Sequence, residues 1–196
     1  MPALSSVCVF CGSNSGADPA YLKAAADVGR SLAERGMRLV YGGAHVGMMG
    51  VLANAAMEAG GAVTGVIPRQ IVDLEVAHDH VRDLRIVDSM HERKALMADL
   101  ADAFVALPGG IGTLEELFEV FTWAHLGLHR KPLGLLDVLG YYAPLEAMLD
   151  HAVEQRFLRA ETRAMLVRDD SLDGLLGRFA DWQPARGARW IDRAGS

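Results

Sequence analysis

Short apolar runs alternate along the whole chain with longer segments whose apolar positions recur at helical spacing. Runs of this kind are typical of strands buried in a parallel sheet, and the segments between them are typical of helices that cover it. Strands are predicted at 7–10, 38–41, 62–67, 84–87, 103–107, 132–136 and 164–167. Helices are predicted at 19–35, from the loop 42–50 to residue 59, at 90–101, from the loop 109–112 to residue 126, at 141–155 and at 172–179, with a loop or short irregular helix at 69–83.

This alternation predicts an α/β fold, a Rossmann-like parallel sheet with helices on both faces. In such sheets, ligands bind beyond the carboxyl ends of strands, where the strand order reverses. Glycine-bearing loops follow three predicted strands, at 12–16, 42–50 and 109–112. We expect these loops to converge on one crevice. We also expect residues 1–180 to form a single domain and 181–196 to form a polar, fraying tail.

The most informative segment is 108–116, which reads PGGIGTLEE between a predicted strand and a predicted helix. Free N–H groups and the positive end of the helix dipole make such a junction an anion site. Gly109, Gly110 and Gly112 let a ligand approach the backbone closely, and Thr113 adds a hydroxyl donor. Glu116 then places a carboxylate beside the bound group. The segment therefore predicts chemistry on a small phosphorylated molecule.

Thr113 and Glu116 also fit a capping box, in which the threonine caps the helix and the glutamate bonds back to the cap. That interpretation makes Glu116 structural, although capping alone does not require three preceding glycines. The segment 42–50 lacks the G-x-G-x-x-G spacing, and no acidic residue follows the next strand, so NAD binding is disfavoured. No G-x-x-x-x-G-K-[ST] sequence occurs, which excludes a P-loop.

A second capping box is predicted at Ser89 and Glu92, at the start of the helix 90–101. Arg93 and Lys94 follow in its first turns, where cations are mildly unfavourable. Such a local inconsistency is often tied to function. The alternative is a solvated basic pair.

The charge balance limits the partners of the chain. Its 196 residues carry a formal net charge of −6, and no block of basic residues occurs, so nucleic acid is not expected as a partner. No apolar run approaches the roughly 20 residues that span a bilayer. The first residues lack the charged start of a signal peptide, so we expect a cytoplasmic location and no membrane contact.

Metal and redox motifs are weak. Cys8 and Cys11 lie three apart in a strand-like run, so they should point to opposite faces as packed, reduced thiols. His78 and His80 stand in a polar loop without a strong third ligand. His125 and His129 are separated by Gly127, which should end the helix between them. No metal ligand is therefore assigned.

Through these motifs, the chain resembles the LOG-type cytokinin riboside 5′-monophosphate phosphoribohydrolases, which are also described as lysine decarboxylases. The pattern P-G-G-x-G-T-x-x-E is met in full at 108–116, and M-x-x-R-K is met by Met90, Arg93 and Lys94. The runs VCVFCGS at 7–13 and GVIP at 65–68 are also similar. The resemblance covers about 7–176. Ala44 departs from the family's G-G-G at 42–44.

The resemblance implies hydrolysis of the N-glycosidic bond of an N6-modified AMP to free base and ribose 5-phosphate. It implies a homodimer, no metal and no cofactor. It assigns Glu116 and Arg93 as catalytic residues. The substrate-binding residues that it implies are Glu75, Arg93, Lys94, Gly109, Gly110, Ile111, Gly112, Thr113, Leu114, Glu115, Glu116 and Thr122.

Chemistry supports these roles independently. Glycosidic cleavage passes through an oxocarbenium-like state, which a carboxylate such as Glu116 can stabilise while it orients or deprotonates water. Arg93 keeps its proton, because the guanidinium pKa exceeds about 12, and should act as a hydrogen-bonding anchor.

Two other functions remain open. One is a nucleotide-binding carrier or sensor on the same scaffold, which needs neither Glu116 nor Arg93 for chemistry. The other is lysine decarboxylation, which needs pyridoxal phosphate on a lysine. Lys23, Lys94 and Lys131 are the only lysines of the chain, and none is well placed in the pattern.

Overall fold

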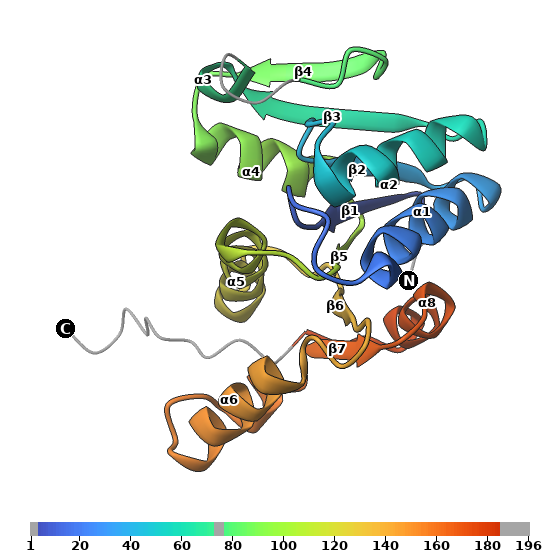
Figure 1. Ribbon diagram of the computed structural model, residues 1–196. Helices are drawn as coiled ribbons and strands as arrows, with labels where there is room; N and C mark the ends of the chain where they lie inside the picture. Colours follow the sequence, from blue (N-terminus) through green and yellow to red (C-terminus); the bar gives the residue numbers. More distant parts are fainter. Residues whose placement is uncertain (1–3, 73–76, 185–196) are drawn as a thin grey trace.

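The computed structural model describes residues 4–72 and 77–184, which form a seven-stranded parallel sheet with helices on both faces (Figure 1). The strands are β1 (Ser6–Phe10), β2 (Arg38–Tyr41), β3 (Val63–Pro68), β4 (Asp83–Val87), β5 (Ala103–Ala106), β6 (Leu133–Leu136) and β7 (Leu166–Asp169). The helices are α1 (Pro19–Glu34), α2 (Gly47–Glu58), α3 (Arg69–Val72), α4 (Met90–Leu100), α5 (Ile111–Leu126), α6 (Ala143–Glu154), α7 (Ala160–Arg163) and α8 (Leu172–Ala180).

The strand order is β4-β3-β2-β1-β5-β6-β7, and every pairing is parallel. The chain moves outward from β1 to β4 and then crosses back to place β5 on the other side of β1. The order therefore reverses between β1 and β5, where Val7 pairs with Ala103 and Phe10 with Ala106. The loops after these two strands leave the sheet side by side, which opens a crevice at its carboxyl edge.

Two apolar clusters hold the layers together, one on each face of the sheet. Helices α1, α2 and α8 cover one face, with Val28, Leu52 and Phe179 in its core. Helices α4 and α5 cover the other face, as Figure 1 shows. Met97 and Leu117 lie in the core on that side. The predicted three-layer α/β class is thus confirmed.

The two cysteines show that side chains alternate between the two faces of the sheet along β1 and the residues that follow it. Cys8 is buried in the cluster under α4 and α5, whereas Cys11 is buried in the cluster under α1 and α2. Both are free thiols, as predicted. Burial raises the pKa of each thiol, and the charge of Glu116 raises it further.

The structure corrects the prediction at the end of the domain. The tail was expected to fray from residue 181, but Trp182 is only 4% exposed and packs in the cluster under α4 and α5. Its indole Nε1 donates a hydrogen bond to the Met165 carbonyl at 2.7 Å. A single aromatic residue in a polar segment carries no periodic signal, so the pattern missed it.

Within the described residues, no helix is both long and apolar enough to cross a membrane.

Candidate active site

A cavity of about 540 Å³ lies at the carboxyl ends of β1, β2 and β5. All three glycine-bearing loops contribute to it, which confirms that they converge on one crevice. The residues that line it are Cys11, Gly12, Ser13, Asn14, Gly16, Tyr21, Met48, Met49, Ile71, Arg93, Pro108, Gly109, Gly110, Ile111, Gly112, Thr113, Glu116 and Tyr141.

Backbone hydrogen bonds join the three loops. The Gly12 N–H donates to the Pro108 carbonyl at 3.1 Å, and the Met48 N–H donates to the Gly12 carbonyl at 3.1 Å. Gly47 has φ +55°, and a Cβ there would lie 2.2 Å from the Ser13 carbonyl oxygen. Only glycine permits this approach. The floor of the crevice is therefore a bonded unit rather than three independent loops.

The glycine loop leads directly into α5. Gly110 is the N-cap, and the Leu114 N–H donates back to its carbonyl at 3.1 Å. The preceding N–H groups of Ile111, Gly112 and Thr113 therefore have no intrahelical acceptor. They converge at the positive end of the α5 dipole, where an anion is stabilised.

The predicted capping box at Thr113 and Glu116 is wrong. The helix begins at Ile111, so Thr113 lies inside the first turn, and the cap makes no side-chain hydrogen bond. A Cβ on Gly109 would meet Thr113 Oγ1 at 2.1 Å, so this glycine lets the loop close onto the threonine. With capping removed, no helix-terminus role accounts for Glu116.

Gly110 and Gly112 differ from Gly109, because a Cβ on either would meet no protein atom within 4 Å. Neither residue has φ in the left-handed region. Packing within the described residues therefore does not require glycine at these positions.

Arg93 and Glu116 meet on the floor of the cavity, brought there by α4 and α5. Each is 9% exposed, and Arg93 Nη2 lies 3.5 Å from Glu116 Oε1. The same Nη2 donates to the Gly42 carbonyl at 3.3 Å. A Cβ on Gly42 would lie 2.2 Å from Nη2, so glycine at 42 lets the guanidinium cross the loop.

Burial raises the pKa of the Glu116 carboxyl, and Arg93 opposes that shift. The pair thus holds a carboxylate in a desolvated site with one cation as its counter-charge. A carboxylate held this way can interact strongly with a positive charge that develops nearby.

Lys94 is placed differently from Arg93. Its Nζ lies 2.5 Å from Glu115 Oε1 and 3.0 Å from Glu119 Oε2, and it does not line the cavity. Its side chain is only 8% exposed, so the alternative of a solvated basic pair is wrong. Burial acts to lower the pKa of Lys94, but its two carboxylate partners outweigh that and raise it.

The other predicted substrate residues are not all in the cavity. Ile111 lines it and is 85% exposed, whereas Leu114 and Glu115 do not line it. Thr122 is exposed on α5, outside the cavity, and its hydroxyl donates to the Phe118 carbonyl. Glu75 lies outside the described residues. Ala44 fits the loop at 42–44 as a buried residue without positive φ.

The histidines form no metal cluster within the described part of the chain. His78 is buried, and its Nε2 lies 3.1 Å from Asn54 Oδ1. His125 Nδ1 lies 3.0 Å from Thr162 Oγ1, and His129 Nε2 lies 2.9 Å from the Val120 carbonyl. Helix α5 ends at Leu126, with Gly127 as its left-handed cap, which confirms the predicted break between these two histidines.

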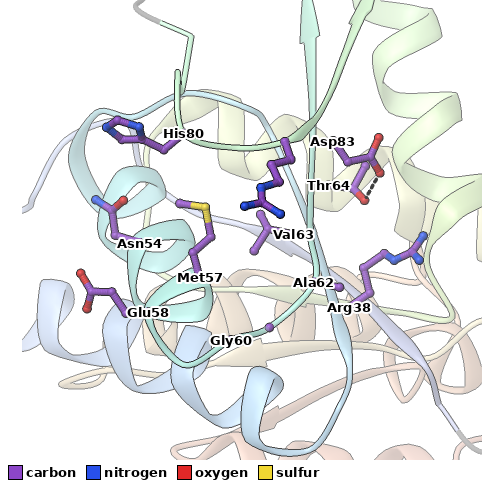
Figure 2. A pocket seen from close by; sticks show the side chains of 12 residues that line it. Arg38, Asn54, Met57, Glu58, Gly60, Ala62, Val63, Thr64, His80 and Asp83 are labelled. Atoms are coloured by element: carbon purple, nitrogen blue, oxygen red, sulfur yellow. Dashed lines mark hydrogen bonds between the residues drawn. The ribbon is translucent and has the colours of Figure 1, made fainter.

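A larger hollow of about 780 Å³ lies at the opposite edge of the sheet, at the amino ends of β2, β3 and β4 (Figure 2). Its charged residues are of both signs, and Arg38, Glu58 and Arg82 are exposed. Asp83 accepts a hydrogen bond from Thr64 at 2.7 Å, which Figure 2 marks. The hollow contains none of the predicted site residues.

Sequence reasoning missed several cavity residues, among them Tyr21, Met49 and Tyr141. They come from α1, α2 and the segment before α6, and no short motif connects them. Only Tyr141 stands out in retrospect, because it begins a Tyr-Tyr pair directly after Gly140.

Comparison with known proteins places this chain in a family. The family model described as "Possible lysine decarboxylase" matches residues 49–178. The chain is 49% identical over 176 residues to the cytokinin riboside 5′-monophosphate phosphoribohydrolase of Rhodococcoides fascians, covering 89% of each chain. The chain belongs to this phosphoribohydrolase family. It is also 44% identical to the LOG enzyme of Oryza sativa subsp. japonica over 95% of this chain and 78% of that one. The corresponding figures for LOG7 of Arabidopsis thaliana are 47%, 91% and 82%.

Solved structures extend the fold beyond the family. A molybdenum cofactor carrier protein from Chlamydomonas reinhardtii superposes with a TM-score of 0.69 at 20% identity, covering 91% of this chain and 98% of that one. A molybdenum cofactor binding protein from Rippkaea orientalis gives 0.68 at 21% identity, over 92% and 98%. At this level of identity, the likeness concerns the fold alone.

The lysines of this phosphoribohydrolase family member do not fit a pyridoxal phosphate site. None of the three lysines of the chain lines the cavity. Lys23 pairs with Asp27 on the exposed side of α1, and Lys131 donates to the Ala98 carbonyl. Lys94 is held by two carboxylates. The donor set for a Schiff base is therefore missing from the crevice.

Proposed function

We propose that this protein hydrolyses the N-glycosidic bond of a cytokinin riboside 5′-monophosphate, an N6-modified AMP, to free base and ribose 5-phosphate. The observation that carries the proposal is the buried Arg93–Glu116 pair, 3.5 Å apart, beside the free N–H groups that open α5. The names of the relatives at 44–49% identity support it.

The 5′-phosphate binds at the start of α5. The N–H groups of Ile111, Gly112 and Thr113 have no intrahelical acceptor, and the dipole favours an anion there. Glycine at 110 and 112 leaves room for a phosphate, because packing within the described residues does not require it there. Thr113 adds its hydroxyl.

Glu116 then lies beside the ribose. As the glycosidic bond breaks, positive charge develops on the sugar, and the desolvated carboxylate stabilises it. The same carboxylate orients or deprotonates the water that attacks the anomeric carbon. Arg93 opposes the effect of burial by lowering the pKa of Glu116, and it donates hydrogen bonds to the nucleotide. Lys94, with Glu115 and Glu119, positions the adjoining turns of α4 and α5, and its predicted contact with the nucleotide requires a change of partner.

The competing function is a nucleotide carrier or sensor. Such a protein needs the phosphate site, but it has no use for a buried carboxylate opposite the sugar. Burial of Glu116 costs free energy, because the pKa shift favours its neutral form. Retention of the charged pair in the cavity therefore favours the hydrolase.

The test is a chromatographic assay of purified protein with isopentenyladenosine monophosphate and, in parallel, with AMP, without added metal. Release of free base from the modified nucleotide, lost in Glu116→Gln, supports the hydrolase. The ratio of the two rates measures preference for the N6 substituent. Tight binding of both nucleotides with no base released from either identifies a carrier or sensor instead.

We further propose a homodimer in the cytoplasm. Thr122 is exposed and outside the cavity of its own chain, so a contact of Thr122 with substrate requires the site of a second copy. Leu126 and Leu128, 56% and 70% exposed near the end of α5, offer an apolar surface to such a copy. Light scattering of the purified protein checks this, and a monomeric mass contradicts it. A nucleotide substrate and two free thiols fit a cytoplasmic location.

A further inference from the structure

Two consecutive tyrosines brace the segment that leads into the phosphate loop. The Tyr142 hydroxyl donates to the Leu107 carbonyl at 2.6 Å, and the Tyr141 hydroxyl donates to the Gly109 carbonyl at 2.5 Å. Tyr142 is 1% exposed, whereas Tyr141 lines the cavity and is 38% exposed. One hydroxyl therefore supports the buried end of β5, and the other supports the wall of the cavity.

The tyrosines are presented by a strained turn between β6 and α6. Leu139 and Gly140 have φ of 55° and 73°, and the Tyr141 N–H donates to the Val138 carbonyl at 3.1 Å. Two consecutive left-handed residues are the geometry of a type I′ turn. Leucine is strained in this region, and such strain persists where the surroundings impose it, often beside a ligand site.

The ring of Tyr141 is fixed from two sides. It packs edge-on against Tyr21 of α1, with ring centroids 6.0 Å apart, and against Tyr142 at 5.1 Å. The hydroxyl is thus held at the Gly109 carbonyl by packing as well as by its hydrogen bond.

Planarity of the peptide bond connects this brace to the anion site. The Gly109 carbonyl and the Gly110 N–H belong to one trans peptide and point in opposite directions. Holding the carbonyl therefore fixes the direction of the N–H at the N-cap of α5. The Gly110 N–H makes no hydrogen bond within the described residues, so it is available to a ligand.

We propose that Tyr141 is a positioning residue that sets the affinity of the glycine loop for a phosphate ester, acting through the Gly109–Gly110 peptide. The proposal rests on the proposed function for the identity of the ligand. Without the hydroxyl, two adjacent glycines can turn their shared peptide, and the loop must be ordered when the phosphate binds.

The test is calorimetric titration of wild-type protein and Tyr141→Phe with ribose 5-phosphate and with inorganic phosphate. We expect the dissociation constant of ribose 5-phosphate to rise about threefold to tenfold, the range for loss of one hydrogen bond. With the nucleoside monophosphate, KM should rise by a similar factor while kcat changes less. The matched control is Tyr142→Phe, which should lower the melting temperature more and the phosphate affinity less.

The outcomes separate this proposal from the proposed function. Unchanged affinity of Tyr141→Phe for ribose 5-phosphate, or a loss confined to kcat, overturns the role of Tyr141 even if the wild type is a hydrolase. Weakened binding in the variant with no base release by the wild type supports Tyr141 and overturns the hydrolase. A wild type that releases free base but binds neither ribose 5-phosphate nor phosphate overturns the role of Tyr141 and leaves the hydrolase standing.

Discussion

Two carboxylates lie at opposite ends of the central strands β1 and β5, and their surroundings shift their pKa values in opposite directions. Asp102, just before β5, accepts hydrogen bonds at 2.7–3.0 Å from the backbone and hydroxyl groups of Ser5 and Ser6. Burial acts to raise the pKa of Asp102, but these bonds outweigh it and lower the pKa. Glu116, at the carboxyl edge, has Arg93 at 3.5 Å and a raised pKa.

The difference separates a carboxylate that is satisfied by structural hydrogen bonds from the carboxylate that we propose acts in catalysis. At the amino edge, backbone and hydroxyl donors satisfy the charge, and it ties β1 to β5. At the carboxyl edge, the Glu116 carboxylate is paired with Arg93 and lines the cavity. The exposed hollow at the amino ends of β2, β3 and β4 (Figure 2) follows the first pattern, because Thr64 and Arg85 satisfy Asp83 and lower its pKa. The larger of the two depressions is therefore not the one that we propose as the active site.

The largest expected effect distinguishes Glu116 from Asp102. Glu116→Gln should lower kcat for free-base release about 10³-fold, since it removes the charge that stabilises the transition state. Asp102→Asn should keep kcat within about twofold and lower the melting temperature, because weaker acceptors remain for Ser5 and Ser6. Steady-state kinetics and thermal melts measure both. Equal losses of activity in the two variants would contradict the distinction.

The next effect concerns the counter-charge. Arg93→Gln should lower kcat about 10²-fold, as for loss of one electrostatic donor. Because Arg93 holds the Glu116 pKa down, the acid limb of kcat should move to higher pH in this variant. In the wild type that limb should already lie above about pH 4.3, the ordinary glutamate value.

Arg93→Lys is the matched control, since it retains a cation near Glu116. Its acid limb should stay close to that of the wild type, even if its kcat falls because a lysine presents a different hydrogen-bonding geometry. A pH profile of kcat that is the same in Arg93→Gln and wild type would show that Glu116 does not titrate in the catalytic step.

A smaller effect tests the glycine loop. Gly112→Ala should raise KM about tenfold without lowering the melting temperature, because the added methyl meets no protein atom and instead crowds the phosphate. Gly177→Ala in α8 also places its methyl in open space and should leave KM unchanged. A fall in stability of Gly112→Ala would show that the glycine serves packing rather than the ligand.

The smallest expected effect concerns the contribution of Asp102 to the free energy of unfolding. The lowered pKa of Asp102 contributes stability that is present above about pH 3.9, its unfolded value, and is lost as the pH falls through the folded pKa. Urea unfolding from neutral to acid pH should therefore show a steeper loss of stability for wild type than for Asp102→Asn. The difference should be about 1–2 kcal/mol. Parallel curves would contradict it.

The features that the sequence predicted correctly are those set by patterns among neighbouring residues. Strand and helix alternation, the three glycine loops and the opposed cysteines depend on periodicity and on glycine chemistry within a few residues. The capping box at Thr113 and Glu116 failed because the helix starts earlier, with Gly110 as its cap. A glycine cap carries no side-chain signal, so the spacing of polar residues was a poor guide there.

Long-range contacts escaped prediction for a different reason. Tyr141 reaches Gly109 across 32 positions, and Lys94 reaches Glu115 across 21. Nothing in the sequence around either residue specifies its partner, since the partner depends on how β5, β6 and α4 pack. The burial of Trp182 likewise depends on the Met165 carbonyl, which no local pattern places beneath it.

The opposed thiols of Cys8 in β1 and Cys11 just after it have a practical consequence for spectroscopy. Both cysteines of the chain are buried and carry raised pKa values, so at neutral pH they remain poorly nucleophilic thiols. A cysteine introduced at an exposed position such as Phe157, which is 90% exposed, would then react selectively with a maleimide dye. Fluorescent or spin-labelled protein could be prepared without first removing either native cysteine.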